Sequence, residues 1–324
     1  MLVNRVKDYR KGKGLTQEEL ATKTGVSRQT IISIEKNKFI PGLDLALKVS
    51  KALEINIDKL FYYVWMNNID AVISWVDGSE EEYQKKIKKH LPTFANYKKQ
   101  YLHVNEIEYC VKSIIRFAPF IRKILIVTDN QTPSFNGIEE LILSKKVRIV
   151  DHKEIFKGYE EHLPTFNPRS IDALLYKIDG LAERFVYFND DMFLINEIKE
   201  EDWFINNKAV LIGRWTNSYR INPIKVLSGN FKKLFSLRPS FNASQSMSAN
   251  ISGFKKKYFK SFHTARPQVK SQIKNYYNKN PEVLKKQISY KFRNSNQYMP
   301  YSLCWHLLIK DKQAEIKTEK EFME

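Results

Sequence analysis

The chain has 324 residues, 43% of them hydrophobic, and carries a formal net charge of +18 at pH 7. This length exceeds one average domain and this apolar content can form at least one sizeable core, so we expect two domains. The sequence excludes a membrane span, which needs roughly 20 apolar residues, a secretory signal and, with two cysteines, a disulfide framework. We therefore expect a cytoplasmic protein.

The N-terminal part contains four short amphipathic patterns separated by Gly and Pro, which predict a compact helical bundle without strands. The expected helices cover residues 3–11, 16–24, 28–36 and 43–53. Thr16 and Glu19 have the spacing of a capping box, and Ser27 is placed to cap the third helix. Gly25 should end the second helix, because glycine readily adopts the left-handed backbone conformation.

Two helices joined by a glycine-containing turn, with polar residues outside on the second, are typical of a helix-turn-helix that enters the major groove. Residues 15–61 resemble the lambda-repressor-like helix-turn-helix of the Xre family. This resemblance implies that DNA is contacted by Gln17, Arg28, Gln29, Ser33 and Lys36. The alternatives are a packing or dimerisation module that binds no DNA, and a fused segment.

Beyond residue 65 the pattern changes, so we divide the chain into domains 1–65 and 66–324. Short β-branched and aromatic runs alternate there with helical stretches, which predicts a Rossmann-like mixed α/β sheet flanked by helices. Three expected strands carry polar residues: IDAVISWVDGS ends in Trp75, Asp77 and Gly78; KILIVTDNQTP ends in Thr128, Asp129 and Asn130; and RFVYFNDDMFLI holds Asn189, Asp190 and Asp191. Ligands of open α/β sheets bind beyond the carboxyl ends of strands, so these residues can form one site.

Asp190 and Asp191 adjoin an otherwise apolar run, where an uncompensated charge is costly to bury. A bound cation compensates that cost. Oxygen ligands without neighbouring His or Cys suit Mg²⁺ or Mn²⁺, which usually join one or two carboxylates to substrate phosphates. The alternative for this pair is a turn or a helix cap.

Several blocks of the larger part resemble the Stealth family of sugar-phosphate transferases. The blocks, in order, are IDAVISWVDGS, SIIRFAPFIRKILIVTDNQTP, VRIVDHKEIF, LPTFNPRSIDALLYKIDGLAERFVYFNDDMFL, SFHTARP and YKFRNS. The resemblance implies transfer of a hexose-1-phosphate or N-acetylhexosamine-1-phosphate from a UDP-sugar to a carbohydrate hydroxyl. UMP would leave, and the product would be a capsular polysaccharide or exopolysaccharide.

The resemblance also implies roles for individual residues. Asp77, Asp190 and Asp191 would hold the donor pyrophosphate and its metal, because phosphoryl transfer depends on positioning and charge neutralisation. His263 would be the general base, since imidazoles exchange protons near neutral pH, and Arg293 would clamp the transferring phosphate. The remaining donor or sugar contacts would be Trp75, Gly78, Asp129, Asn167, Arg169, Asp172 and Asn189. An alternative for Trp75 is a core aromatic.

Residues 216–310 contain 18 Lys and Arg against the single acidic residue Glu282, interleaved with aromatics. This composition suits a phosphodiester-linked or lipid-linked glycan acceptor, but also single-stranded nucleic acid or an anionic membrane surface, where the protein would bind peripherally at the inner face. An alternative for the whole chain is a DNA-binding transcriptional regulator whose α/β part senses a nucleotide-sugar.

Overall fold

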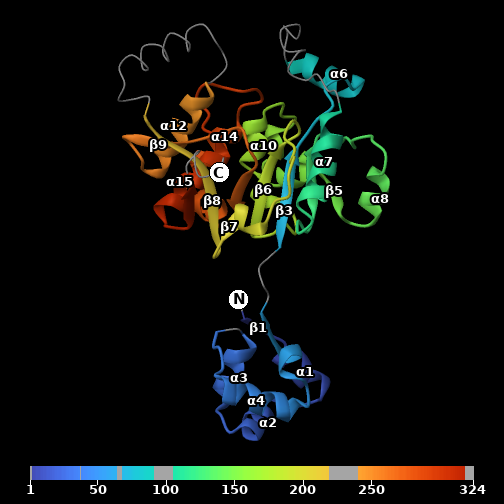
Figure 1. Cartoon of the computed structure of the whole chain (residues 1–324), viewed down its shortest axis with the longest axis vertical. Coiled ribbons are helices and arrows are strands. Elements are labelled where there is room, and N and C mark those ends of the chain that lie inside the picture. The colour runs from blue at the N-terminus through green and yellow to red at the C-terminus, as the bar shows by residue number, and fades with distance from the viewer. Residues whose placement is uncertain (1, 37, 64–67, 91–104, 219–239, 318–324) are drawn as a thin grey trace. The chain divides into compact units, whose positions relative to one another are not determined.

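The structure, a computed structural model, describes residues 2–36, 38–63, 68–90, 105–218 and 240–317. The chain divides into two compact units, Met1–Asn67 and Asn68–Glu324 (Figure 1). The predicted fold class, a small helical module followed by a mixed α/β sheet flanked by helices, is confirmed. No helix among the described residues is both long and apolar enough to span a membrane.

The first unit packs five helices around an apolar core. They are α1 (Val6–Gly12), α2 (Gln17–Thr24), α3 (Arg28–Glu35), α4 (Leu43–Leu53) and α5 (Ile57–Leu60). The predicted capping box is confirmed, because the Glu19 amide donates to Thr16 Oγ1 at 3.1 Å and the Thr16 amide donates to Glu19 Oε2 at 2.6 Å. Ser27 caps α3, and Gly25 ends α2 with a φ of 71°.

The predicted start of the first helix at residue 3 is wrong, and so is the absence of strands. Strand β1 (Leu2–Asn4) pairs antiparallel with β2 (Phe61–Tyr63), and the first helix begins at Val6. The Asn4 side chain accepts from the Val6 amide at 3.1 Å and donates to the Ile34 carbonyl at 2.7 Å. The strand partner β2 and the Ile34 carbonyl lie far along the chain, so a local pattern could not indicate them.

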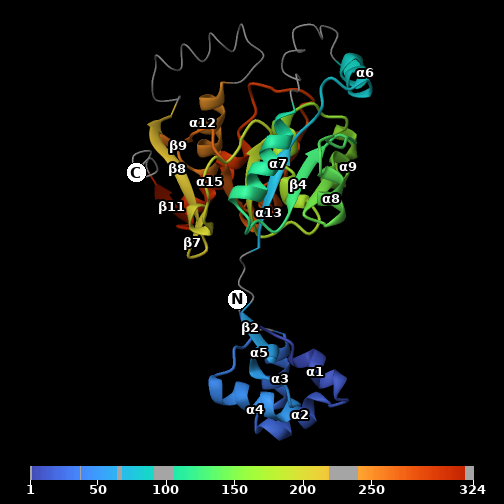
Figure 2. The same ribbon diagram turned by 45° about the vertical axis from the view of Figure 1, so that its right-hand side comes forward.

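The larger unit contains a five-stranded sheet in the order β10-β6-β3-β4-β5 (Figures 1 and 2). Its strands are β3 (Ile69–Ser74), β4 (Ile124–Thr128), β5 (Val147–Asp151), β6 (Arg184–Asn189) and β10 (Arg266–Val269). The first four are parallel, and β10 runs antiparallel beside β6. The three predicted strands are therefore confirmed. Since the chain passes from β3 to β4 and β5 and then returns to the other side of β3, the topology reverses at β3.

A second sheet forms around the long strand β8 (Lys208–Asn217). It also contains β7 (Phe204–Ile205), β9 (Lys257–Ser261) and β11 (Ala314–Lys317). The described helices of this unit are α6 (Glu81–His90), α7 (Glu106–Phe117), α8 (Ile138–Leu143), α9 (His152–Ile155), α10 (Pro168–Asp172), α12 (Phe241–Ser252), α13 (Lys270–Lys279), α14 (Pro281–Ile288) and α15 (Pro300–Lys310). Helix α15 is the most deeply embedded of them, with every residue from Pro300 to Leu308 buried.

Gly213 allows β9 to approach β8 closely. A Cβ atom at this position would lie 2.4 Å from the Lys260 carbonyl oxygen and 2.8 Å from the Phe259 ring. The first contact is with backbone, so a side-chain rotation cannot relieve it. Glycine is required here for lack of space, and not for an unusual backbone angle.

We predict that Gly213→Ala lowers the free energy of unfolding of the larger unit by about 1–3 kcal/mol, because overpacking must separate the strands. Chemical denaturation followed by circular dichroism measures this change. The control is Arg214→Ala, which removes an exposed side chain from the same strand. Equal stability of Gly213→Ala and wild type would contradict this account of the strand packing.

Candidate active site

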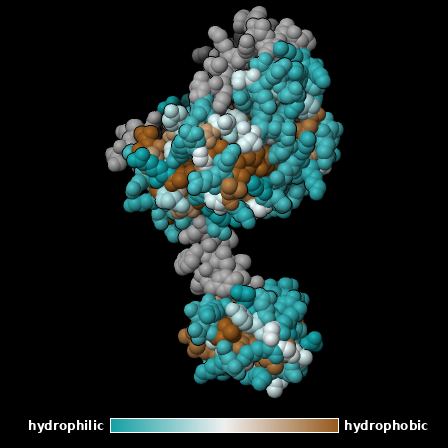
Figure 3. Space-filling view, turned by 90° about the vertical axis from the view of Figure 1, so that its right-hand side faces the viewer, coloured by the Kyte–Doolittle hydropathy of each residue, from teal (hydrophilic) through white to brown (hydrophobic). Residues whose placement is uncertain are grey.

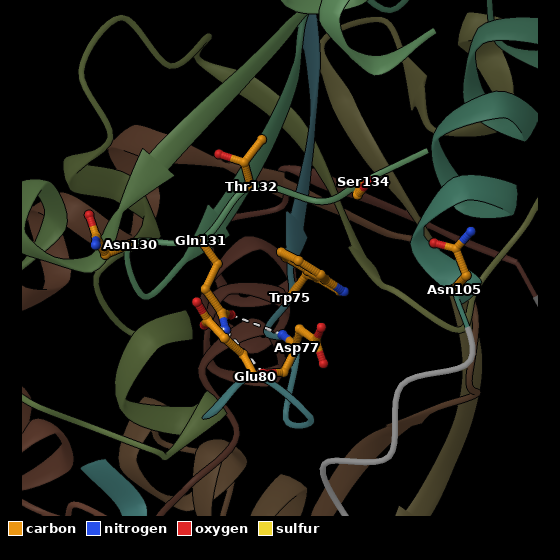
Figure 4. A pocket seen from close by; sticks show the side chains of 8 residues that line it. All are labelled: Trp75, Asp77, Glu80, Asn105, Asn130, Gln131, Thr132 and Ser134. Atoms are coloured by element: carbon orange, nitrogen blue, oxygen red, sulfur yellow. Dashed lines mark hydrogen bonds between the residues drawn. The ribbon is translucent and has the colours of Figure 1, made fainter. Parts of the chain in front are cut away.

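A cavity of about 570 Å³ lies beyond the carboxyl ends of β3 and β4. Its lining residues are Trp75, Asp77, Glu80, Asn105, Asn130, Gln131, Thr132 and Ser134 (Figure 4). In that view Asn105 and Asn130 lie on opposite sides, with Trp75 and Asp77 between them. Trp75 is only 5% exposed, so it is part of the core as well as of the cavity wall.

Gln131 holds the chain at Asp77 in place. The Asp77 amide donates to Gln131 Oε1 at 2.9 Å, and Gln131 Nε2 donates to the Asp77 carbonyl at 3.0 Å (Figure 4). The Asp77 carboxylate accepts from the Ser79 amide at 2.8 Å and from its hydroxyl at 2.6 Å through Oδ1. The other carboxylate oxygen of Asp77 makes no hydrogen bond to a described residue. Because Asp77 lines the cavity, this oxygen can contact a ligand there.

The acidic pair, Asp190 and Asp191, directly follows β6. Asp191 Oδ1 lies 4.0 Å from His263 Nε2, and both side chains are just over half exposed. Asn189 Nδ2 lies 3.2 Å from the same imidazole nitrogen. His263 comes from the loop between β9 and β10, so the antiparallel pairing of β10 with β6 brings the imidazole to the acidic pair.

The acidic pair and the cavity meet at the first turns of α7. Asn105 lines the cavity, and the charge of the next residue, Glu106, contributes to raising the pKa of Asp190. One turn later the Cys110 thiol contacts the Asn189 carbonyl at 3.7 Å. Burial, with the charges of Asp190 and Asp191, raises the pKa of that thiol. The first two turns of α7 therefore join the cavity wall to the chain segment that carries the acidic pair.

A buried network of charged and polar groups lies beneath this site. Ser74 Oγ donates to Asp172 Oδ1 at 3.3 Å, and Tyr187 also hydrogen-bonds that carboxyl group. Burial raises the pKa of Asp172 to about 6, although these hydrogen bonds and the charges of Arg266 and Arg293 oppose the rise. The exposed Arg293 guanidinium thus lies close enough to Asp172 to lower its pKa, and Asp172 accepts a hydrogen bond from Ser74 at the end of β3.

Asn167 and Arg169 are buried, which corrects the prediction that they line the cleft. Asn167 Nδ2 donates to the carbonyls of Tyr290 and Phe292 at 2.9 and 2.8 Å, and to Gln297 Oε1 at 2.9 Å. Arg169 Nη1 donates to Ser244 Oγ at 2.7 Å, and burial together with nearby Arg293 lowers the pKa of Arg169 to about 10. Asn167 therefore holds the loop that carries Arg293.

Two further predicted contacts are occupied by the protein itself. The Asp129 carboxylate forms an ion pair with Lys86 of α6 at 3.1 Å, although its neighbour Asn130 lines the cavity. Gly78 is buried, and its carbonyl accepts from Gln84 Nε2 at 3.2 Å. Asp129 and Gly78 therefore make contacts within the protein that hold the cavity wall in place.

The fit of a divalent cation can be tested on the acidic pair. Burial and the charge of Asp191 raise the pKa of Asp190 to about 6, a penalty that a cation would remove. Within the described ranges, no group of three or more His, Cys, Asp and Glu side chains is arranged to hold a metal ion. Two carboxylates completed by substrate phosphates and water are the usual environment of Mg²⁺. The residues thus fit a cation shared with a substrate, and not a cage made only by protein.

The predicted DNA-contacting residues of the first unit divide into two groups. Arg28, Gln29 and Lys36 are exposed on or beside α3, and Ser33 is partly buried there. Gln17 instead donates to Glu35 Oε2 at 2.9 Å. Glu35 also accepts from the buried Arg10 at 2.6 and 3.2 Å, so Gln17 belongs to a network that joins the helices.

Sequence reasoning missed Arg266, which is 2% exposed. Its guanidinium donates to Asn189 Oδ1 at 3.3 Å and lies 4.2 Å from the centre of the Tyr301 ring. The signal was present in the SFHTARP block, because an arginine at the start of a buried strand needs compensating partners as much as a carboxylate does. Its partners come from other elements and could not be named in advance.

Comparison with known proteins agrees with this architecture. Residues 100–212 match the family described as Stealth protein CR2, conserved region 2. Residues 6–60 match the family described as Helix-turn-helix. The first match contains the acidic pair, whereas Asp77, His263 and Arg293 lie outside it.

Several relatives are capsular or receptor polysaccharide phosphotransferases. The enzyme cps1A of Actinobacillus pleuropneumoniae is 35% identical over 187 residues, which are 53% of this chain and 50% of the relative. The enzyme fcs1 of Haemophilus influenzae is 41% identical over 146 residues, 43% of this chain and 38% of the relative. WefC of Streptococcus oralis is 27% identical over 253 residues, 71% of this chain and 74% of the relative.

The chain spans about half the length of the first of these relatives. The Stealth match lies within the larger unit, and the helix-turn-helix match lies within the N-terminal unit. The chain is therefore similar to the Stealth family within its larger unit and to the helix-turn-helix family within its N-terminal unit.

Proposed function

We propose that the larger unit transfers a hexose-1-phosphate or N-acetylhexosamine-1-phosphate from a UDP-sugar to a carbohydrate hydroxyl in polysaccharide synthesis. The observation that carries this proposal is the meeting of Asp191 and His263 at 4.0 Å beside a cavity large enough for a nucleotide. The polysaccharide phosphotransferases among the relatives support the reaction class.

The donor would place its nucleotide end in the cavity and its pyrophosphate at the acidic pair. Trp75 offers an aromatic wall for the base, and the side-chain amides of Asn105 and Asn130 offer hydrogen bonds (Figure 4). Mg²⁺ or Mn²⁺ at Asp190 and Asp191 would neutralise the pyrophosphate oxygens. Arg293, which is exposed and close enough to Asp172 to lower its pKa, would bind the phosphate that is transferred.

Two buried or partly buried groups fix the surroundings of His263. Arg266 donates to Asn189 Oδ1, which turns Asn189 Nδ2 towards His263 Nε2. This contact orients the imidazole ring. Arg266 and Asn189 are thus positioning residues for His263.

The proposed step is an in-line displacement at phosphorus. The acceptor hydroxyl oxygen forms a bond to the phosphorus that bears the sugar, and its proton passes to His263 Nε2. The phosphoanhydride bond breaks, and its electron pair leaves with UMP. Asp191, beside the imidazole, stabilises the positive charge that His263 gains.

We predict that the purified chain with Mg²⁺, a panel of UDP-sugars and oligosaccharide acceptors releases UMP, because the phosphoanhydride is the bond that breaks. Chromatographic separation of UMP from UDP measures the outcome. A reaction without acceptor is the control. Release of UDP would mean that the sugar–oxygen bond breaks, which would make the chain an ordinary glycosyltransferase.

We predict that His263→Ala lowers kcat by about 10²–10⁴-fold, the usual contribution of a general base, while UDP-sugar binding is retained. Asp191→Ala should weaken Mg²⁺-dependent UDP-sugar binding as well. Calorimetry and initial rates separate the two effects. Matched controls are His162→Ala, outside the site, and Asp179→Ala, an exposed carboxylate in the loop that precedes β6. Near-normal turnover of His263→Ala would remove the general-base assignment.

A second candidate function belongs to the first unit, for which we propose DNA binding. The favouring observation is that Ser27 caps α3 and leaves Arg28 and Gln29 exposed in its first turn, the part of a recognition helix that meets base edges. A regulator that only senses a nucleotide-sugar would need the cavity, but not His263 beside Asp191.

We predict that Gln29→Ala and Arg28→Ala weaken binding to a sequence selected from a random oligonucleotide library by about tenfold or more, since one base contact contributes roughly 1–3 kcal/mol. Fluorescence anisotropy at several salt concentrations measures the affinity. Lys48→Ala on α4, whose cation pairs with Asp44, is the control. Failure of wild-type selection to enrich any sequence would reject this second function.

A further inference from the structure

Three large apolar side chains of the larger unit are exposed close to the acidic pair. Tyr109 is 65% exposed, Phe193 is 51% exposed and Ile195 is 78% exposed, whereas most residues of their kind are buried in this unit. Phe193 and Ile195 follow Asp191 within four residues, and Tyr109 adjoins Cys110, which contacts the chain at Asn189. Exposed apolar surface that is gathered in one place marks an interaction site.

The segment after the acidic pair is fixed along α7. Its first contact is the Cys110 thiol with the Asn189 carbonyl at 3.7 Å. Next, the Leu194 amide donates to Ser113 Oγ at 3.0 Å, and the Ile198 amide donates to the Phe117 carbonyl at 2.8 Å. The helix residues are spaced by three and four positions, so they lie on one face of α7. Residues 189–198 therefore run beside the helix in the same direction.

This attachment decides which side chains face outward. Met192 is 7% exposed, and its sulfur accepts from the Asn189 amide at 3.5 Å. Leu194 is partly buried and packs against the core. In an extended segment alternate side chains point to opposite sides, so Phe193 and Ile195 are presented to the outside while their neighbours hold the segment. The exposed Phe193 ring is therefore carried by a segment whose backbone is hydrogen-bonded to α7.

The location relates this surface to the proposed reaction. The cavity beside Trp75 and Asn105 would hold the nucleotide of the donor, and the hydroxyl that attacks must lie at His263. The surface next to Asp191 and outside the cavity is then the place for the rest of the acceptor. A pyranose ring has an apolar C–H face that packs on an aromatic ring, while its hydroxyl groups stay in water.

We propose that Tyr109, Phe193 and Ile195 form an acceptor-binding surface, defined here as the acceptor platform, on which sugar units adjoining the reacting hydroxyl stack. The inference rests on the proposed function, since it names the substrate surface of the same site. On the face of the larger unit that is seen in Figure 3, apolar surface lies among hydrophilic regions.

The charges around the acceptor platform favour a sugar over a membrane. The acidic residues of the chain segments that form it are Glu106, Glu108, Asp190, Asp191 and Glu197, of which Glu108 forms an ion pair with Lys112. An anionic leaflet is attracted by cationic segments and repelled by carboxylates. Uncharged pyranose rings carry no such penalty.

The test is the binding of soluble oligosaccharides to the full chain. Wild type is titrated by calorimetry with two- to six-unit oligosaccharides of glucose, galactose, N-acetylglucosamine and N-acetylmannosamine. For the tightest binder, Phe193→Ala should raise Kd about tenfold, the upper range for an aromatic contact. Phe193→Tyr should restore the affinity, and Phe193→Leu should not, because leucine keeps apolar area without a ring face.

Kinetics with the same oligosaccharide add a second measurement. Phe193→Ala should raise the acceptor KM by the same factor and leave the UDP-sugar KM unchanged. The matched control is Leu143→Ala on α8, an 81% exposed apolar side chain elsewhere in the unit, which should change neither value. Circular dichroism of each variant checks that the fold is retained.

The outcomes separate this inference from the proposed function. Oligosaccharide binding that depends on Phe193 without UMP release would reject the transferase and retain the acceptor platform. UMP release with an acceptor KM that Phe193→Ala leaves unchanged would reject the acceptor platform alone. The acceptor platform would also be rejected if no oligosaccharide bound to wild type, or if Phe193→Leu bound oligosaccharide as tightly as wild type does. A third contradicting outcome is that Phe193→Ala loses binding to anionic phospholipid vesicles and keeps binding to oligosaccharides.

Discussion

The parallel register of β3 and β6 is the constraint on which the rest of the site depends. It places Ser74 directly opposite Asn189, so both strands end at the same level of the sheet. The chain therefore leaves the sheet as Trp75 to Asp77 on one side and as Asp190 and Asp191 on the other. A shift by one residue would turn each of these side chains to the opposite face. Hydrophobic burial on both faces of the sheet prevents that shift.

At the carboxyl end of the sheet the protein holds partly buried carboxyl groups whose charge needs compensation. Burial raises the pKa of both Asp172 and Asp190 to about 6, which marks carboxylates held in an environment that disfavours their charge. Buried Arg266 compensates part of this by its charge and also orients Asn189. Strongly shifted carboxyl groups gathered in one cleft are typical of functional sites. A bound cation would lower the cost of the Asp190 charge.

Much of the local structure could be predicted from the residues themselves. The capping box at Thr16, the presence of β3, β4 and β6, and the exposure of Arg28 and Gln29 follow from short-range patterns, although the three strands end earlier than predicted, at Ser74, Thr128 and Asn189. The strand before α1 could not be predicted, because its ladder partner lies at the other end of the unit. The burial of Asn167 was equally hidden, since an amide suits a ligand and a buried loop alike.

By itself, the sequence determined the identity of the chemical groups and the elements that carry them, because caps, turns and apolar periodicity act over a few residues. It also determined that Asp190 and Asp191 stand where a strand stops. Only the tertiary structure decided which of these groups meet. It brought His263 to Asp191 and Arg266 to Asn189. It also paired Asp129 with Lys86 and Gln17 with Glu35, two contacts within the protein. Those pairings depend on strand order and on contacts between distant segments, which local patterns do not encode.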